Sequence, residues 1–310
     1  MAGNTTNRST TIMDELNVTY ITLGGHVEVD RFRYVYFFIM FIAYILILCS
    51  NSIIVYIIWV HQHLHEPMYI FIAALTLNCI LYSTAIYPKL LIDFLSEKQI
   101  ISYSACLFQF QIFYSLAMAY DRYVSICKPL QYHTIMRKTA VSVFLFFAWL
   151  LPACHTAVPT ILSSKAKLCD LTLKGIFCNN SIYKLQCEAS RVITIYGVVS
   201  LVDLSILPML FIIFTYIKIF IVTYRSCREV RKKAAETCLP HLLVLISFSI
   251  LCAYDISTAR VESNFSKTTH LIMMLQTILY HSVFNPLIYG LKMTEISKHL
   301  KRLLCPAKII

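Results

Sequence analysis

Three consecutive residues, Asp121, Arg122 and Tyr123, place an acid, a base and an aromatic ring directly after an apolar run. A carboxylate beside a guanidinium forms an ion pair, and an ion pair at a helix end is a two-state element that a bound ligand can bias. A plain interfacial salt bridge is the other interpretation of the same residues. Either interpretation concerns charge pairing and not bond-making chemistry.

No other group of residues predicts catalysis. The chain has only six glycines, none in a phosphate-cradling loop, and no nucleophile–base arrangement rises above chance. His61, His63 and His65 alternate along the chain and raise the question of a metal site, but the only acid beside them is Glu66. A solvated loop explains these histidines more simply. We therefore expect no enzyme, no cofactor and no metal ion.

The composition predicts a membrane protein. Hydrophobic residues make up 58% of the 310 residues and charged residues 14%, against roughly 25% charged residues in a soluble domain. The formal net charge is +11, which raises the question of nucleic acid. The basic residues lie in short clusters beside apolar runs, as expected at a membrane surface. We expect membrane lipid as a partner and no nucleic acid.

Apolar runs define the elements that position these residues. A helix crosses the bilayer core with roughly 20 residues, and polar residues inside such helices favour packing on one another. A doubtful third run, Leu107–Tyr120, has only 14 residues before Asp121. The six clearer runs are Tyr34–Val60, Met68–Leu91, Ala140–Val158, Val192–Tyr224, Leu239–Tyr254 and Leu271–Leu291. The prediction is an all-α bundle of seven transmembrane helices whose third helix is abnormally short.

An eighth helix is expected after the last span. Ile296, Leu300, Leu303 and Leu304 share one helical face, with basic residues among them, which is typical of an amphipathic helix at a membrane surface. We therefore divide the chain into an extracellular tail (1–33), a seven-helix transmembrane domain (34–291) and a cytoplasmic eighth helix with its tail (292–310).

Orientation follows from the basic loops. Arginines and lysines gather near 128–138, 225–233 and 298–302, and we assign that side to the cytoplasm, although a long loop on the other side also carries lysines. The sequons for N-glycosylation all fall on the opposite side, at Asn4, Asn7, Asn17, Asn179 and Asn264. The N-terminus is therefore expected outside the cell. Cys106, Cys169, Cys178 and Cys187 share that side, where disulfides persist, and spacing alone leaves all three of their pairings open.

Longer motifs carry a family resemblance. These motifs follow one another along the chain after Asn51, and they are Leu64–Tyr69, Met118–Leu130, Lys233–Leu242 and Asn285–Tyr289. Together they resemble the odorant receptors, a branch of the seven-helix G-protein-coupled receptors, and the wording leans toward the fish type. The resemblance implies a plasma-membrane receptor, in olfactory cilia, that binds a small-molecule odorant and activates a stimulatory, olfactory-type G protein.

The resemblance also implies roles for individual residues. It implies disulfides between Cys106 and Cys178 and between Cys169 and Cys187. The intramembrane acid Asp203 is a ligand candidate by default, followed by Tyr254 and Asp255, although interfacial water is a slightly better explanation for Asp255. The residues implied for the G-protein switch are Asp121, Arg122, Tyr123, Tyr216, Asn285, Pro286 and Tyr289.

Two departures from the family pattern keep other interpretations open. Cys79 stands where most receptors have an aspartate, which counts against sodium binding there. Arg122 follows Cys106 by only 16 positions. Compared with the family pattern, about nine residues near Phe113–Ala117 are missing from this segment. Nine residues correspond to roughly 13.5 Å and two and a half turns of helix. The alternatives are a defective family member that does not signal and, less favoured, a transporter, for which internal repeats are lacking.

Overall fold

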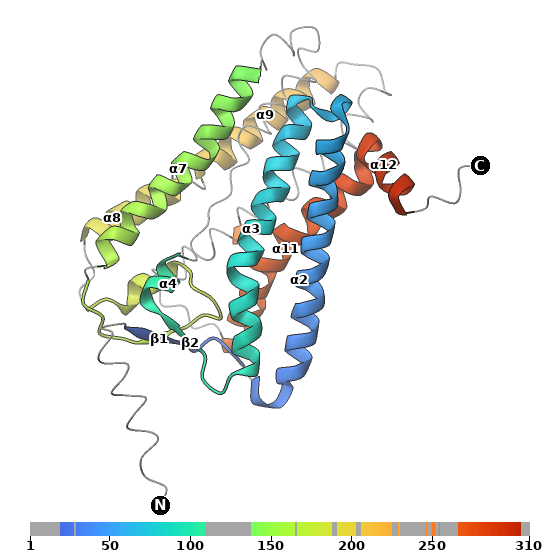
Figure 1. The fold of residues 1–310 in the computed structure, drawn as a ribbon. Helices are drawn as coiled ribbons and strands as arrows, with labels where there is room; N and C mark the ends of the chain where they lie inside the picture. The colour runs from blue at the N-terminus through green and yellow to red at the C-terminus, as the bar shows by residue number, and fades with distance from the viewer. Residues whose placement is uncertain are drawn as a thin grey trace, which may run out of the picture.

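The computed structural model describes residues 19–27, 29–108, 138–164, 166–187, 191–202, 206–224 and 266–304, with positions 229, 246, 250, 251 and 254. Within these residues the chain is mainly helical, and a small sheet lies at one end of the bundle (Figure 1). The elements are β1 (Tyr20–Leu23), α2 (Val29–Val60), η1 (Gln62–Leu64), α3 (Pro67–Leu95), β2 (Ile100–Ser102), α4 (Tyr103–Phe108), α7 (Lys138–Ser164), β3 (Thr172–Leu173), η2 (Asn180–Leu185), α8 (Arg191–Leu201), α9 (Leu207–Tyr224), α11 (Lys267–Lys292) and α12 (Thr294–Leu304).

Three of the described helices, α2, α3 and α11, are long and apolar enough to cross a membrane. A bilayer core is about 30 Å thick, which roughly 20 helical residues span. On α2, Phe38, Ile42 and Leu46 are 60%, 56% and 62% exposed. Large apolar side chains on one open face of a helix are accounted for by contact with lipid, which solvates them without the penalty of water.

The predicted spans coincide with helices wherever the structure describes them. α2, α3, α7 and α11 contain the apolar runs that begin at Tyr34, Met68, Ala140 and Leu271. The run 192–224 contains α9 and all of α8 except Arg191, with 203–205 outside the described residues. The third run begins in α4 and continues beyond the described part, and the sixth is described only at four helical positions.

Local chemistry sets the starts of two of these helices. Pro67 occupies the first turn of α3, where its missing N–H leaves no helical hydrogen bond unmade. Ser266 caps α11, because its Oγ accepts the backbone N–H of Thr269 at 3.1 Å. The first turns of both helices are therefore fixed by residues that precede the apolar runs.

Two apolar clusters hold α2, α3 and α11 together. The cluster at the sheet end packs Ile47, Tyr87 and Ile278 from these helices against Phe177, which lies in the loop after β3. The cluster at the other end joins Ile57, Ile72 and Tyr289 to Leu64 of η1 and Ile296 of α12. Because α12 contributes to this second core, it lies against the end of the bundle opposite the sheet (Figure 1).

The small sheet was not expected, since the sequence predicts an all-α chain. β1 is the middle strand and pairs antiparallel with β2 (Ile21 with Ile101) and parallel with β3 (Thr22 with Thr172). Alternate residues of β1, Ile21 and Leu23, face inward and are buried. Residues 20–23 of the predicted tail are thereby tied to the loop after α3 and to the loop after α7.

One close backbone contact beside the sheet yields a prediction. Gly25 donates its N–H to the carbonyl oxygen of Gly175 at 3.2 Å, and a Cβ at position 25 would lie 2.5 Å from the carbonyl carbon of Gly175. Gly25→Ala is expected to lower the free energy of unfolding by about 1–3 kcal/mol, because backbone must move. The thermal midpoint of the purified chain measures this. Gly290→Ala, whose Cβ would lie 3.5 Å from Leu300 Cδ2, is the matched control; equal shifts would contradict the prediction.

Candidate functional site

A polar cluster lies between α2, α3 and α11, where the sequence predicts part of the switch. Pro286 has no N–H, so the carbonyl of Ser282, four residues earlier, has no donor from the helix ladder. Asn51 of α2 replaces that donor. Its Nδ2 donates to the Ser282 carbonyl oxygen at 3.1 Å and to that of Ile47 at 2.8 Å, and Asn51 is fully buried.

Two further contacts join α11 to α3. Ser83 Oγ donates to Ser282 Oγ at 3.1 Å, and Asn285 Nδ2 donates to Cys79 Sγ at 3.5 Å. Cys79 is fully buried and supplies a thiol where the family pattern has a carboxylate. Tyr289, one turn beyond Asn285, is buried in the apolar cluster at the α12 end. The structure thus brings Asn285, Pro286 and Tyr289 together on the face of α11 that contacts α2 and α3.

Asn51→Leu tests the side chain that substitutes for the missing proline donor. Leucine keeps the volume but leaves the buried Ser282 carbonyl unpaired, so we expect a loss of about 1–3 kcal/mol in stability. The fall in thermal midpoint of the purified chain is the measurement. Ser50→Ala is the control, since Ser50 Oγ donates to the carbonyl oxygen of Ile47 in its own helix, at 3.3 Å. A fall no larger than that of the control would refute the role of Asn51.

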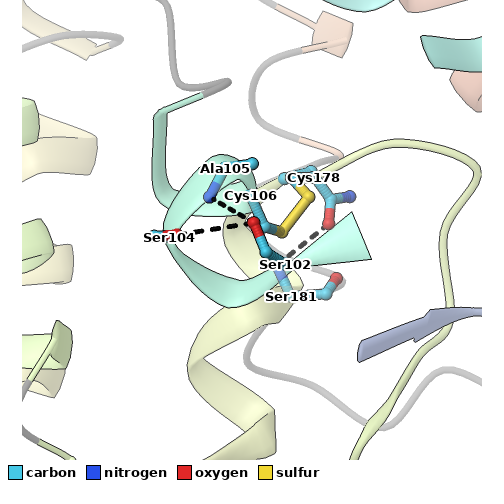
Figure 2. The surroundings of a disulfide bond; sticks show 7 residues. Ser102, Ser104, Ala105, Cys106, Cys178 and Ser181 are labelled. Carbon is cyan, nitrogen blue, oxygen red and sulfur yellow. Dashed lines mark hydrogen bonds between the residues drawn. A yellow bond between two sulfur atoms is a disulfide. The ribbon is translucent and has the colours of Figure 1, made fainter. Parts of the chain in front are cut away.

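Two disulfides lie at the sheet end of the bundle. Cys106 of α4 pairs with Cys178, with Cα atoms 5.2 Å apart, and Cys169 pairs with Cys187. These are the pairings that the resemblance implies. Figure 2 shows the first, beside Ser102, whose Oγ accepts the N–H of Ala105 at 3.3 Å and so caps α4. The start of the third helix is therefore covalently tied to the loop that follows β3.

One ligand candidate lies in the described part of the chain. Tyr254 Oη is 3.1 Å from Nδ1 of His270, which links its segment to the first turn of α11. Asp203 and Asp255 lie outside the described residues, as do Asp121, Arg122 and Tyr123 of the switch and the sequons at Asn4, Asn7, Asn17 and Asn264.

Two other predicted residues have a described place. Tyr216 lies in α9. Asn179 is buried before η2, and its Oδ1 accepts the N–H of Ser181 at 3.1 Å. Its glycosylation stays a prediction.

The sequence analysis did not predict an ion pair in α3 between a buried carboxylate and a lysine whose side chain is 25% exposed. Lys89 Nζ donates to Oδ1 of Asp93, one turn further along, and Asp93 is 1% exposed. Nearby, burial lowers the pKa of His26, an effect that Lys89 reinforces and the Leu23 carbonyl opposes. The signal was available, because acids within membrane helices are rare and four-residue spacing places two charges on one helix face.

Comparison of the sequence with known proteins identifies the family. A sequence model of the olfactory receptor family matches residues 39–307. Olfactory receptor 1 of Rattus norvegicus is 31% identical over 98% of both chains. Olfactory receptor 1L8 of Homo sapiens is 31% identical over 86% of this chain and 90% of its own. Olfactory receptor 52A5 of Homo sapiens is 33% identical over 83% of this chain and 85% of its own. The chain therefore belongs to the olfactory receptor family, whose members are seven-helix, G-protein-coupled receptors of the plasma membrane and not enzymes.

Proposed function

We propose that this chain binds a small odorant among the outer halves of its helices and activates a stimulatory, olfactory-type G protein. Its N-terminus would be extracellular and its eighth helix cytoplasmic, in the membrane of an olfactory cilium. Asp203, Tyr254 and Asp255 are the proposed ligand contacts. Asp121, Arg122 and Tyr123 are the proposed switch, acting with Tyr216 and the α11 residues Asn285, Pro286 and Tyr289.

The observation that carries this proposal is the polar cluster at Pro286. α11 is joined to α2 and α3 there by hydrogen bonds from Asn51, Ser83 and Asn285. Each such bond stabilises the packed arrangement by only about 1 kcal/mol net. A ligand that binds one arrangement a few kcal/mol more tightly than another can therefore shift α11, because a ligand moves an equilibrium by its differential affinity.

The function is tested in cells that carry the full chain with an extracellular N-terminal tag. Surface staining and cyclic AMP are measured together across a panel of odorants. We expect a cyclic AMP response that Arg122→Ala abolishes while surface staining stays unchanged. A response that persists in Arg122→Ala would refute the switch assignment. A chain that reaches the surface but raises cyclic AMP neither basally nor with odorant would refute coupling.

A second candidate function, a family member that does not signal, rests on the disulfide to Cys106. That bond ties Cys106 to the outer loops, and Arg122 follows after 16 positions. A helix of that length rises about 24 Å, short of the roughly 30 Å bilayer core. Extended backbone would reach further but would leave its N–H and C=O groups unsatisfied in lipid.

The two candidates are separated by lengthening the third segment. Inserting about nine apolar residues after Phe113 adds roughly 13.5 Å of helix. If the short segment prevents crossing, this insertion raises surface display severalfold, and a Gly/Ser insertion of equal length at the same place does not. Staining of tags at both termini, before and after permeabilisation, reports display and topology. A lengthened chain that stays inside the cell counts against the defective-helix interpretation.

A further inference from the structure

A cluster of metal-ligating side chains lies at the end of the bundle opposite the sheet. His63 comes from η1, between α2 and α3, and His299 comes from α12, 236 positions later. Their Nε2 atoms are 3.2 Å apart. Glu295 completes the group, because its carboxylate lies within 4.8 Å of both imidazole nitrogens. We propose that His63, Glu295 and His299 bind a divalent transition-metal ion, with Zn²⁺ as the best match, and that this ion fastens η1 to α12.

The ligand types and distances fit Zn²⁺. Zinc takes imidazole nitrogens at about 2.0–2.1 Å in a tetrahedral arrangement, which places neighbouring ligand atoms roughly 3.3 Å apart. The observed separation of the two Nε2 atoms is 3.2 Å. Glu295 and His299 are four residues apart on α12 and so share one helix face. Two imidazoles and one carboxylate leave the fourth position to water or to another ligand.

The elements that carry these ligands are already held in place. Leu64, next to His63, and Ile296, next to Glu295, are both fully buried in the same apolar cluster. The ligands therefore gather without ordering a flexible loop, which is the main requirement for a metal site of useful affinity.

His61 supports the same arrangement from the side. Its ring centroid lies 3.7 Å from that of His299, and its Nδ1 is 3.0 Å from the carbonyl oxygen of Ile57.

The ion pair of Glu295 presents little competition for the metal. Glu295 contacts Lys298 at 3.8 Å, but the Lys298 side chain is 62% exposed. An exposed ion pair of this kind is worth less than about 1 kcal/mol, so the carboxylate can turn to a metal at small cost. Without a metal, the two Nε2 atoms would share one proton in an N–H···N hydrogen bond, which is the competing explanation of their contact.

The test uses the full chain in lipid nanodiscs, purified through an affinity tag that contains no histidine. Titration with Zn²⁺ is expected to show one saturable site per chain. Titration with Co²⁺, followed by visible absorption, should show that the site is tetrahedral. His63→Ala and His299→Ala should each weaken binding at least tenfold. His65→Ala is the matched control, because His65 lies in the same loop and its Nε2 contacts Trp59 O instead. Binding as weak in His65→Ala as in His299→Ala would overturn the proposal.

A second measurement guards against variants that simply fail to fold. Zn²⁺ should raise the thermal midpoint of the parent chain and of His65→Ala, but not that of His299→Ala. The double variant His63→Cys/His299→Cys should bind Zn²⁺ where His63→Ala and His299→Ala do not, because thiolates are strong zinc ligands. If neither metal changes the thermal midpoint or the absorption spectrum of the parent chain, His63 and His299 form only a hydrogen bond. This outcome refutes the metal site and leaves odorant signalling untouched.

Discussion

Lys89→Met is expected to destabilise the chain by about 3 kcal/mol, because it leaves the carboxylate of Asp93 buried without a cation. Asp93 is 1% exposed, and Lys89 Nζ donates to its Oδ1 while Oδ2 has no partner among the described residues. The energetic asymmetry is large. Breaking a buried pair costs several kcal/mol, whereas replacing both partners by apolar groups is often neutral.

This asymmetry supplies the controls. The double variant Lys89→Met/Asp93→Leu should recover most of the thermal midpoint that Lys89→Met loses. Lys98→Met removes the same charge from an exposed position after α3 and should leave the midpoint nearly unchanged. The measurement is thermal unfolding of the purified receptor, with surface display as a cellular counterpart. If Lys89→Met loses no more than Lys98→Met, the ion pair does not stabilise α3.

The spans and the α12 helix could be predicted because their signals are local and repeated. Long apolar runs, such as the one that ends at Val60, can satisfy their backbone in lipid only as helices. The amphipathic pattern around Ile296 and Leu300 is equally self-contained. These features require no knowledge of which segments meet in space. The resemblance then predicts the seven-helix bundle, and the match of the olfactory receptor family over residues 39–307 supports it.

The contacts between segments could not be predicted, because their partners are far apart in the sequence. The role of Asn51 depends on a carbonyl freed by Pro286, and the histidine cluster depends on His299 lying beside His63. Neither pair is close in sequence, so local spacing predicts only a solvated loop for the alternating histidines, and His63 is indeed exposed. The sheet was missed similarly, because the four residues of β1 alternate over too short a stretch to stand out in a polar tail.

The disulfide between Cys106 and Cys178 is expected to stabilise the sheet end of the bundle more than the disulfide between Cys169 and Cys187 does. It closes 72 positions of chain, whereas the bond between Cys169 and Cys187 closes 18. Loop-closure entropy then predicts about 4.4 kcal/mol for the first bond and about 3.2 kcal/mol for the second. Both sulfurs of the first bond are buried, so Cys106→Ser also places a hydroxyl in an apolar cluster.

Cys106→Ser should therefore reduce surface display more than Cys169→Ser does, and the two are matched because each removes one bond and leaves one thiol. Comparable losses would show that closing the longer loop adds nothing.

The same comparison bears on the short third segment. The bond to Cys178 holds Cys106 at the sheet end. If the segment from Cys106 to Arg122 is too short to cross, as the second candidate function proposes, the bond and the crossing compete. In the chain lengthened after Phe113, the bond and the crossing no longer compete, and the loss caused by Cys106→Ser should then be larger than in the parent.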